Sequence, residues 1–147
     1  MVRIELPAAQ YARAFFDANA LIYFLEGPVL LQDKVAALLS RFIKDGVELV
    51  INEIVVAECL YGAYRQKNAK AEASIRAFLF ASGQFEILGI DMTLLDEAAK
   101  AGALVGLKLI DATHLCSAIS SGCDVFVTND QKFKSSPALQ VIQINTL

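Results

Sequence analysis

The chain has 147 residues and 56% of them are hydrophobic, so it is long enough for one domain with a substantial core. That fraction excludes a disordered chain and allows for further burial in an oligomer. The formal net charge of −3 argues against strong nonspecific binding of nucleic acid, which depends on neutralising phosphates. Two short basic intervals, at 65–76 and 132–134, leave room for a local basic strip or a solvated face.

The sequence also indicates a compartment. No apolar stretch is long enough to cross a bilayer, because charges such as Asp17 and Glu26 interrupt each candidate. The first residues do not resemble a signal peptide, since Arg13 and Asp17 occur where an apolar core would be. The three cysteines are odd in number and fit buried thiols better than a disulfide framework or a zinc site. We therefore expect a cytoplasmic protein without a membrane segment.

The first predicted strand, Tyr11–Phe16, is almost entirely apolar and is typical of the buried central strand of a parallel sheet. Asp17 follows it directly, and Asn19 is the predicted N-cap of a helix over Ala20–Glu26. Ligands bind at the carboxyl ends of strands in open α/β sheets. An ionised carboxylate in such a run is costly unless it is paired or bound to a metal, so Asp17 is the first candidate site residue.

The next unit is an amphipathic helix over 31–44, a short strand over Val47–Ile51, and a helix over Glu53–Gln66 with Asn52 as its N-cap. Glu58 shares a face with apolar residues three and four positions away, so it needs a partner. Glu53 lies in the first turn, where a carboxylate complements the helix dipole, and we interpret it as structural.

The rest of the chain continues the alternation of helices and strands. The predicted elements are a helix over Lys70–Ala81, a strand over Phe85–Ile90, a helix over Met92–Val105 capped by Asp91, a helix that begins at Asp111 and ends at Gly122, a strand over Val125–Val127 followed by Thr128, Asn129 and Asp130, and a short edge strand over Val141–Ile144.

This alternation predicts an α/β fold with one domain over residues 11–147, preceded by an arm at residues 1–10. Its sheet is expected to be mainly parallel and twisted, with four to five strands flanked by helices. Right-handed crossovers bring the carboxyl ends of parallel strands to one edge. Four acids can meet there: Asp17, Glu58, Asp111 and Asp130.

Each acid also has a simpler explanation. Asp111 could be a helix N-cap, Asp130 a turn residue, and Glu58 one half of a buried ion pair. Taken together, carboxylates at one site favour a hard divalent cation, Mg²⁺ or Mn²⁺. Such ions activate water in phosphodiester cleavage. Three cysteines and one histidine provide too few soft ligands for a zinc site.

Four segments resemble the ordered motifs of the PIN-domain nucleases, whose best-known small members are the VapC-type toxins. They are Asp17-Ala-Asn-Ala-Leu-Ile, Glu58 with Leu60-Tyr61-Gly62, Asp111-Ala-Thr-His-Leu-Cys-Ser-Ala, and Thr128-Asn-Asp-Gln-Lys-Phe. The resemblance extends from about residue 11 to residue 147. It implies that Asp17, Glu58, Asp111 and Asp130 are the metal-binding and catalytic acids.

The same resemblance implies an Mg²⁺- or Mn²⁺-dependent endoribonuclease that leaves a 5′-phosphate and a 3′-hydroxyl. It further implies a tRNA or ribosomal RNA substrate, a VapB-type antitoxin partner and a homodimer. Asn19, Thr128 and Asn129 are then expected to support the ligands from behind. Ala18 departs from the family pattern, because Thr or Ser is usual after the first acid.

Two other classes of function are open at this point. A phosphohydrolase or a receiver-like phosphoacceptor also places an Asp after its first strand, and Lys132 is the weak candidate for the lysine it needs. A catalytically silent domain that binds a partner through the helices at 30–44 and 69–82 is the second. His114 follows Asp111 by one helical turn and is interpreted as a packed structural residue, because its neighbours are apolar.

Overall fold

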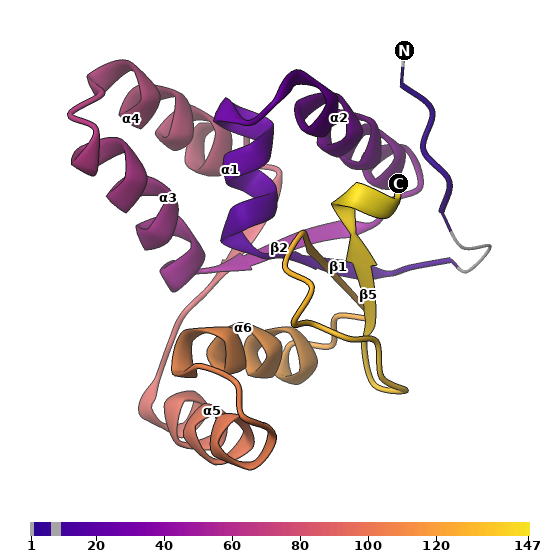
Figure 1. Cartoon of the computed structure of the whole chain (residues 1–147), viewed down its shortest axis with the longest axis vertical. Helices are drawn as coiled ribbons and strands as arrows, with labels where there is room; N and C mark the ends of the chain where they lie inside the picture. The colour runs from indigo at the N-terminus through magenta and orange to yellow at the C-terminus, as the bar shows by residue number, and fades with distance from the viewer. Residues whose placement is uncertain (1, 7–9) are drawn as a thin grey trace.

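The computed structural model describes residues 2–6 and 10–147, which fold around one five-stranded sheet between two layers of helices (Figure 1). The sheet order is β3-β2-β1-β4-β5, and every neighbouring pair is parallel. The strands are β1 (Arg13–Phe16), β2 (Glu48–Asn52), β3 (Phe85–Leu88), β4 (Val125–Thr128) and β5 (Gln140–Gln143). The predicted parallel α/β fold, with the first strand at its centre and the last at an edge, is confirmed.

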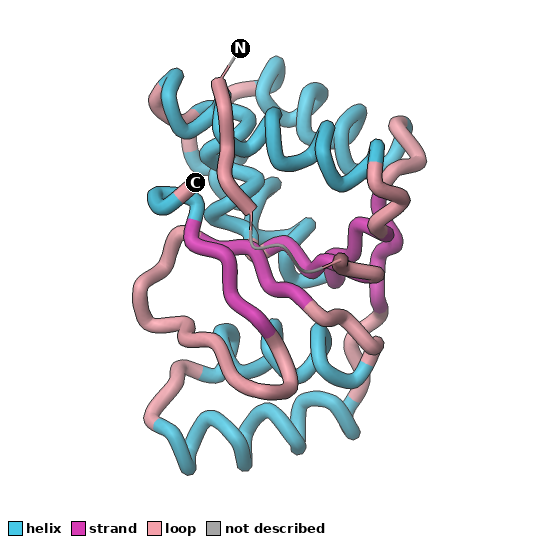
Figure 2. Tube along the Cα trace, turned by 90° about the vertical axis from the view of Figure 1, so that its right-hand side faces the viewer, coloured by secondary structure: helices cyan, strands magenta, loops and turns pink. Residues whose placement is uncertain are grey.

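Helices cover both faces of the sheet. Figure 2 shows α5 and α6 on one side and the remaining helices on the other. A π-helical turn over Ala77–Ala81 continues α4, and a 3-10 helix over Ile144–Thr146 follows β5. The helices are α1 (Ala18–Glu26), α2 (Val29–Lys44), α3 (Glu53–Arg65), α4 (Ala69–Arg76), α5 (Met92–Val105) and α6 (Leu109–Ser120).

Aromatic side chains of β1 form the centre of the core. Phe15 and Phe16 are fully buried, as the apolar run predicts. The Phe15 ring stacks on Phe126 of β4 with centroids 5.4 Å apart, and Phe16 makes edge contacts with Phe42 of α2 and Phe85 of β3. These rings exclude water from both faces of the central strand. Asp17, which follows β1, therefore lies next to a core that excludes water.

Helix starts differ from the prediction at two positions that matter for the site. Asp17, not Asn19, is the N-cap of α1, and its Oδ1 accepts a hydrogen bond from the N–H of Ala18. The prediction was wrong because α1 begins immediately after β1, which leaves Asn19 inside the first turn. Asp111 is not an N-cap either, because α6 begins two residues earlier, after Lys108. The predicted caps Asn52 and Asp91 are confirmed.

The described part of the predicted arm, residues 2–6, contains no helix or strand. Ile4 and Leu6 pack against the core, and Val2, Arg3 and Ile4 line a groove with α2. Residues 7–9 of the predicted arm lie outside the described residues. The domain boundary at residue 10 stays a prediction.

Within the described ranges, no single helix is long and apolar enough to span a membrane. Helices α5 and α6 taken together are long and apolar enough to span one, but the chain bends by 117° between them.

Candidate active site

The sheet register aligns three polar residues where β1, β2 and β4 end. Phe15 pairs with Val50 of β2, and Phe16 pairs with Val127 of β4. Counting onward along the strands, Asp17 falls level with Asn52 on one side and Thr128 on the other. The N–H of Asp17 extends this ladder by donating to the carbonyl of Val127 at 2.9 Å. The strand ends thus bring together residues from distant parts of the sequence, as the parallel topology requires.

The Asp17 carboxylate is held in place by neutral donors. Its Oδ1 accepts from the N–H of Ala18 at 2.9 Å, and its Oδ2 accepts from the hydroxyl of Thr128 at 2.8 Å. The side chain is only 9% exposed, and burial raises the pKa of Asp17 above its ordinary value. The hydrogen bond from Thr128 acts in the opposite direction. Ala18 has no side-chain hydroxyl, and the hydroxyl that contacts Asp17 is that of Thr128.

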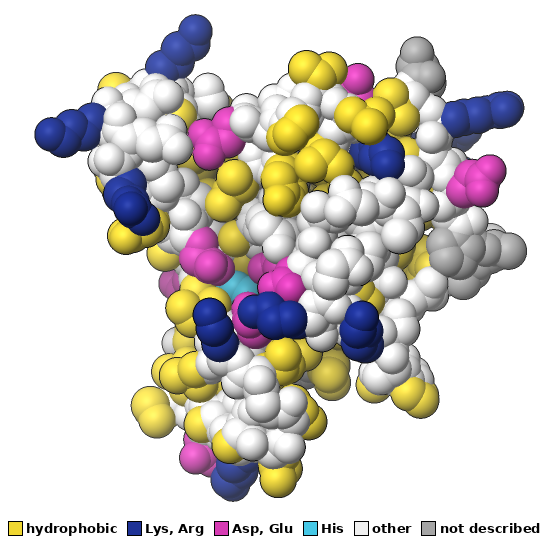
Figure 3. All heavy atoms as spheres, in the orientation of Figure 1, with side chains coloured by type: hydrophobic (Ala, Val, Ile, Leu, Met, Phe, Trp, Pro, Cys, Tyr) yellow, Lys and Arg dark blue, Asp and Glu magenta, His cyan; other side chains and the backbone are white. Residues whose placement is uncertain are grey.

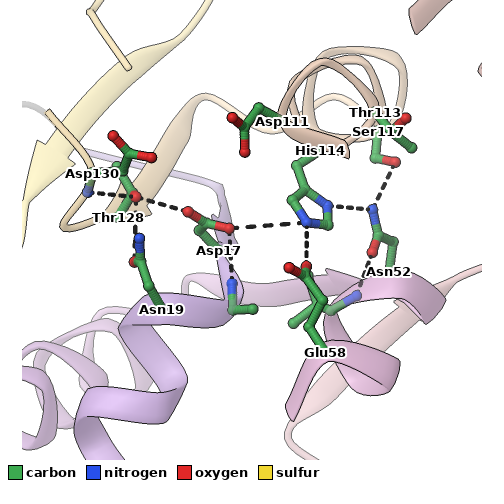
Figure 4. Close-up of polar contacts among 12 residues, drawn as sticks. Asp17, Asn19, Asn52, Glu58, Asp111, Thr113, His114, Ser117, Thr128 and Asp130 are labelled. Atoms are coloured by element: carbon green, nitrogen blue, oxygen red, sulfur yellow. Dashed lines mark hydrogen bonds and ion pairs between the residues drawn. The ribbon is translucent and has the colours of Figure 1, made fainter. Parts of the chain in front are cut away.

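Glu58 reaches the same site from the second turn of α3. Its Oε1 lies 2.7 Å from Nε2 of His114, and this nitrogen is 3.9 Å from Oδ1 of Asp17 (Figure 4). Ligand atoms of the three residues all lie within 4.8 Å of one another. His114 is packed in the interior, and its side chain is 1% exposed. Its neighbours are not all apolar, however, because the ring lies between two of the predicted acids.

Asp111 and Asp130 lie beside this group and share one cation. The ammonium of Lys132 is 3.3 Å from Oδ2 of Asp111 and 3.5 Å from Oδ2 of Asp130. Asp130 also behaves as the turn residue that its position suggests, because its Oδ1 accepts from the N–H of Lys132 at 2.9 Å. Lys132 therefore offsets part of the negative charge of Asp111 and Asp130. Lys132 contacts these two acids and not Asp17, which removes support for the receiver-like alternative.

The three residues expected to support the ligands have different positions. Thr128 contacts Asp17 directly and accepts from the N–H of Asp130 at 3.0 Å. Asn19 accepts from the N–H of Asn129 at 3.0 Å, which links α1 to the loop after β4. The side chain of Asn129 accepts from the N–H of Asn145, away from Asp17. Asn129 is thus connected to the site by its backbone only.

The donor set fits a hard divalent cation. Among residues 2–6 and 10–147, no Lys or Arg side chain pairs with Asp17 or Glu58, so their negative charge is available to a ligand. Figure 3 shows the single histidine in a hollow edged by acidic side chains, with basic side chains at the rim. Carboxylate oxygens at a partly buried, concave position are typical ligands of Mg²⁺ or Mn²⁺.

Sequence reasoning did not assign His114 and Asn52 to this site. His114 is at the i+3 position from Asp111, so the two share a face of α6. Asn52 ends the strand next to β1, which places it level with Asp17. Helical spacing and strand order together could have indicated both residues. The hydrogen bonds between them depend on how α6 packs on the sheet, which the sequence does not show.

Comparison with known families agrees with this arrangement. The PIN domain profile matches residues 14–138, a range that contains all four acids and the strands that position them. The chain belongs to the PIN-domain family. No curated protein sequence matches it.

Solved structures share the PIN fold with this chain. A toxin–antitoxin complex from Klebsiella pneumoniae is 23% identical, covers 89% of this chain and 97% of its own, and has a TM-score of 0.68. VapBC2 from Rickettsia felis, bound to a promoter DNA fragment, is 23% identical with a TM-score of 0.71, over 89% of this chain and 98% of its own. VapC20 from Mycobacterium tuberculosis, described as a toxin that cleaves the sarcin-ricin loop, is 14% identical with a TM-score of 0.60, over 77% of this chain and 86% of its own. At these identities the similarity shows the fold.

Proposed function

We propose that this PIN domain is a divalent-metal-dependent endoribonuclease and the toxin of a VapBC-type pair. The observation that supports this most directly is the meeting of Asp17 and Glu58, from two different elements, with carboxylate oxygens close enough together to hold one ion. Family membership and the likeness to VapC toxins agree with it. Asp17, Glu58, Asp111 and Asp130 are the proposed metal-binding and catalytic acids.

The chain's own residues prepare the site in a specific way. Thr128 and the N–H of Ala18 orient the two oxygens of Asp17, so the carboxylate does not have to reorganise when it binds a cation. Bound Mg²⁺ or Mn²⁺ would activate water and neutralise the charge that develops on the phosphate. Lys132 is exposed at the rim, where an ammonium group can also contact a phosphate of the RNA.

The test of this proposal is cleavage of end-labelled tRNA and ribosomal RNA by the purified protein. Parallel reactions contain Mn²⁺, EDTA, or Mn²⁺ with the Asp17→Asn variant. We expect discrete products with 5′-phosphate and 3′-hydroxyl ends that require both the metal and Asp17. Equal cleavage by parent and variant would identify a contaminant. No cleavage despite Mn²⁺ binding would contradict the nuclease function on these RNAs, and an absence of Mn²⁺ binding would favour a silent interaction domain.

The proposal includes partners and a location. Structures of VapBC complexes are similar to this chain, which supports a VapB-type antitoxin as a partner. Exposed apolar side chains on α5 and α6, among them Met92, Leu104 and Ile119, support a homodimer. We propose that both assemblies form in the cytoplasm. Sedimentation of the purified chain tests the dimer, and a small open reading frame just upstream that encodes a DNA-binding module would support the antitoxin.

A further inference from the structure

His114 has a hydrogen-bonding partner on each ring nitrogen, although the proposed chemistry does not require a histidine. Its Nε2 lies 2.7 Å from Oε1 of Glu58, and its Nδ1 lies 3.0 Å from Nδ2 of Asn52 (Figure 4). The ring is 1% exposed and the Asn52 side chain is fully buried. Water therefore does not compete for either contact, and the partners alone decide which nitrogen holds the proton.

The orientation of the Asn52 amide is determined by the backbone. The N–H of Val55, in the first turn of α3, donates to Oδ1 of Asn52 at 2.9 Å. A backbone N–H requires an oxygen acceptor, so the amide cannot be flipped without placing two donors against each other. The amide nitrogen must then face α6. Its two hydrogens have two acceptors there, Nδ1 of His114 at 3.0 Å and Oγ of Ser117 at 3.1 Å.

This orientation assigns the tautomer of the imidazole. A nitrogen that accepts from an amide has no proton of its own, so Nδ1 of His114 is unprotonated. The proton is on Nε2, which donates it to Oε1 of Glu58. We propose that Asn52 and His114 are positioning residues: Asn52 holds His114 as the Nε2–H tautomer, which orients Glu58 and keeps the imidazole from binding a metal.

The second part of the proposal concerns metal selectivity. Nε2 of His114 is one of three groups close enough together to hold an ion. A neutral imidazole can bind a metal through Nε2 only if its proton moves to Nδ1. That nitrogen would then face the amide hydrogens of Asn52, donor against donor, in a buried site. The site is thereby restricted to oxygen ligands, which suit Mg²⁺ and Mn²⁺ better than Zn²⁺.

The tautomer can be measured directly, because the chain contains one histidine. Long-range ¹H–¹⁵N correlation spectra of the ¹⁵N-labelled protein, prepared without a histidine tag and in EDTA at neutral pH, report the protonation of both ring nitrogens. We expect a protonated Nε2 and an unprotonated Nδ1. Addition of Mg²⁺ or Zn²⁺ is expected to leave the Nε2 proton in place. A protonated Nδ1, or a loss of the Nε2 proton on adding Zn²⁺, would overturn the proposal.

Asn52→Asp tests the role of the amide. Asp is an equally good N-cap, so α3 is preserved, but its carboxylate accepts from Nδ1 instead of donating to it. We expect a proton on Nδ1 in this variant and coordination of Zn²⁺ through Nε2, visible as a shift of that resonance. Ser117→Ala is the matched control, since it removes only the other contact of the amide and should retain the parental tautomer. An unprotonated Nδ1 in Asn52→Asp would show that residue 52 does not control the ring.

The positioning role is tested by the affinity for Mn²⁺, measured by calorimetry. We expect His114→Ala to weaken binding by about 10- to 100-fold, the usual effect of removing a partner of a metal ligand. His114→Gln retains an N–H that can donate to Glu58 and should recover part of this loss. Equal losses in both variants would indicate that the imidazole itself binds the metal.

The calorimetric experiment with Mn²⁺ rests on the proposed function, because it takes Glu58 as a metal ligand. The two can fail separately. A parent that binds no Mn²⁺ and cleaves no RNA would refute the proposed function. The spectra in EDTA would still confirm or refute the tautomer, because they require neither metal nor substrate.

Discussion

Replacing Thr128 by Val tests the hydrogen bond through which β4 holds the Asp17 carboxylate. Thr128 is fully buried, and Val has nearly its shape, so the substitution removes a hydroxyl without opening a cavity. The hydroxyl donates to Oδ2 of Asp17 at 2.8 Å and accepts from the N–H of Asp130 at 3.0 Å. Both contacts are lost in the Thr128→Val variant, as is a longer one from the hydroxyl to Oδ1 of Asn19 at 3.3 Å.

The two contacts differ in strength. A hydrogen bond to a charged group contributes about 1.5–3 kcal/mol, and one between neutral groups about 0.5–1.5 kcal/mol. We therefore expect the variant to lose about 2–4.5 kcal/mol of unfolding free energy at neutral pH in EDTA. For a chain of this length the loss corresponds to a decrease in Tm of about 5–15 °C. Because Asp17 loses a donor that orients it, Mn²⁺ affinity should also fall by about 10- to 100-fold.

Urea and thermal unfolding in EDTA measure the first effect, and calorimetry with Mn²⁺ measures the second. Thr128→Ser is the control, because it retains the hydroxyl and loses one methyl group, which costs about 1 kcal/mol. A Val variant within about 0.5 kcal/mol of the parent would refute the reasoning, given that this is the usual scatter of neutral substitutions. A Ser variant as damaged as the Val variant would show that packing, and not the hydroxyl, determines the effect.

Three further substitutions test other parts of the structure. Burial raises the pKa of Asp17, so the folded protein binds that proton more tightly than the unfolded chain. The parent must then lose stability as the pH rises from the pKa of Asp17 in the unfolded chain through its raised pKa in the folded protein. At neutral pH in EDTA, Asp17→Asn should therefore unfold at a temperature equal to or higher than that of the parent. A much lower Tm of the variant would contradict this. Lys132→Met removes the ammonium that lies 3.3 Å from Asp111 and 3.5 Å from Asp130. The variant should bind Mn²⁺ more tightly than the parent and with a weaker dependence on salt, which titrations at two ionic strengths measure. Phe126→Ala removes a ring that stacks on its neighbour in β1, and should cost about 3–5 kcal/mol in urea unfolding, whereas a loss below about 1 kcal/mol would mean that the core repacks.

Much of the fold follows from local patterns in the sequence. The apolar residues before Asp17 are typical of a buried strand, and Asn52 and Asp91 are good N-cap residues directly before helical patterns. Parallel pairing follows from the alternation of strands and helices, because each crossover returns the chain to the same edge. The four candidate acids could be predicted from the same topology, because each of them follows a strand end or lies on a helix that begins near one.

Only the tertiary structure decides what each of these acids contacts. Glu58 meets His114 because α3 and α6, far apart in the sequence, both pack near the end of β1. Lys132 reaches Asp111 because the loop after β4 lies beside the start of α6. The start of α1 at Ala18, which makes Asp17 a cap as well as a candidate ligand, differs from the best local signal, Asn19. Propensity is weaker than the packing of a whole helix, and hydrogen bonds between distant segments leave no periodic trace in the sequence.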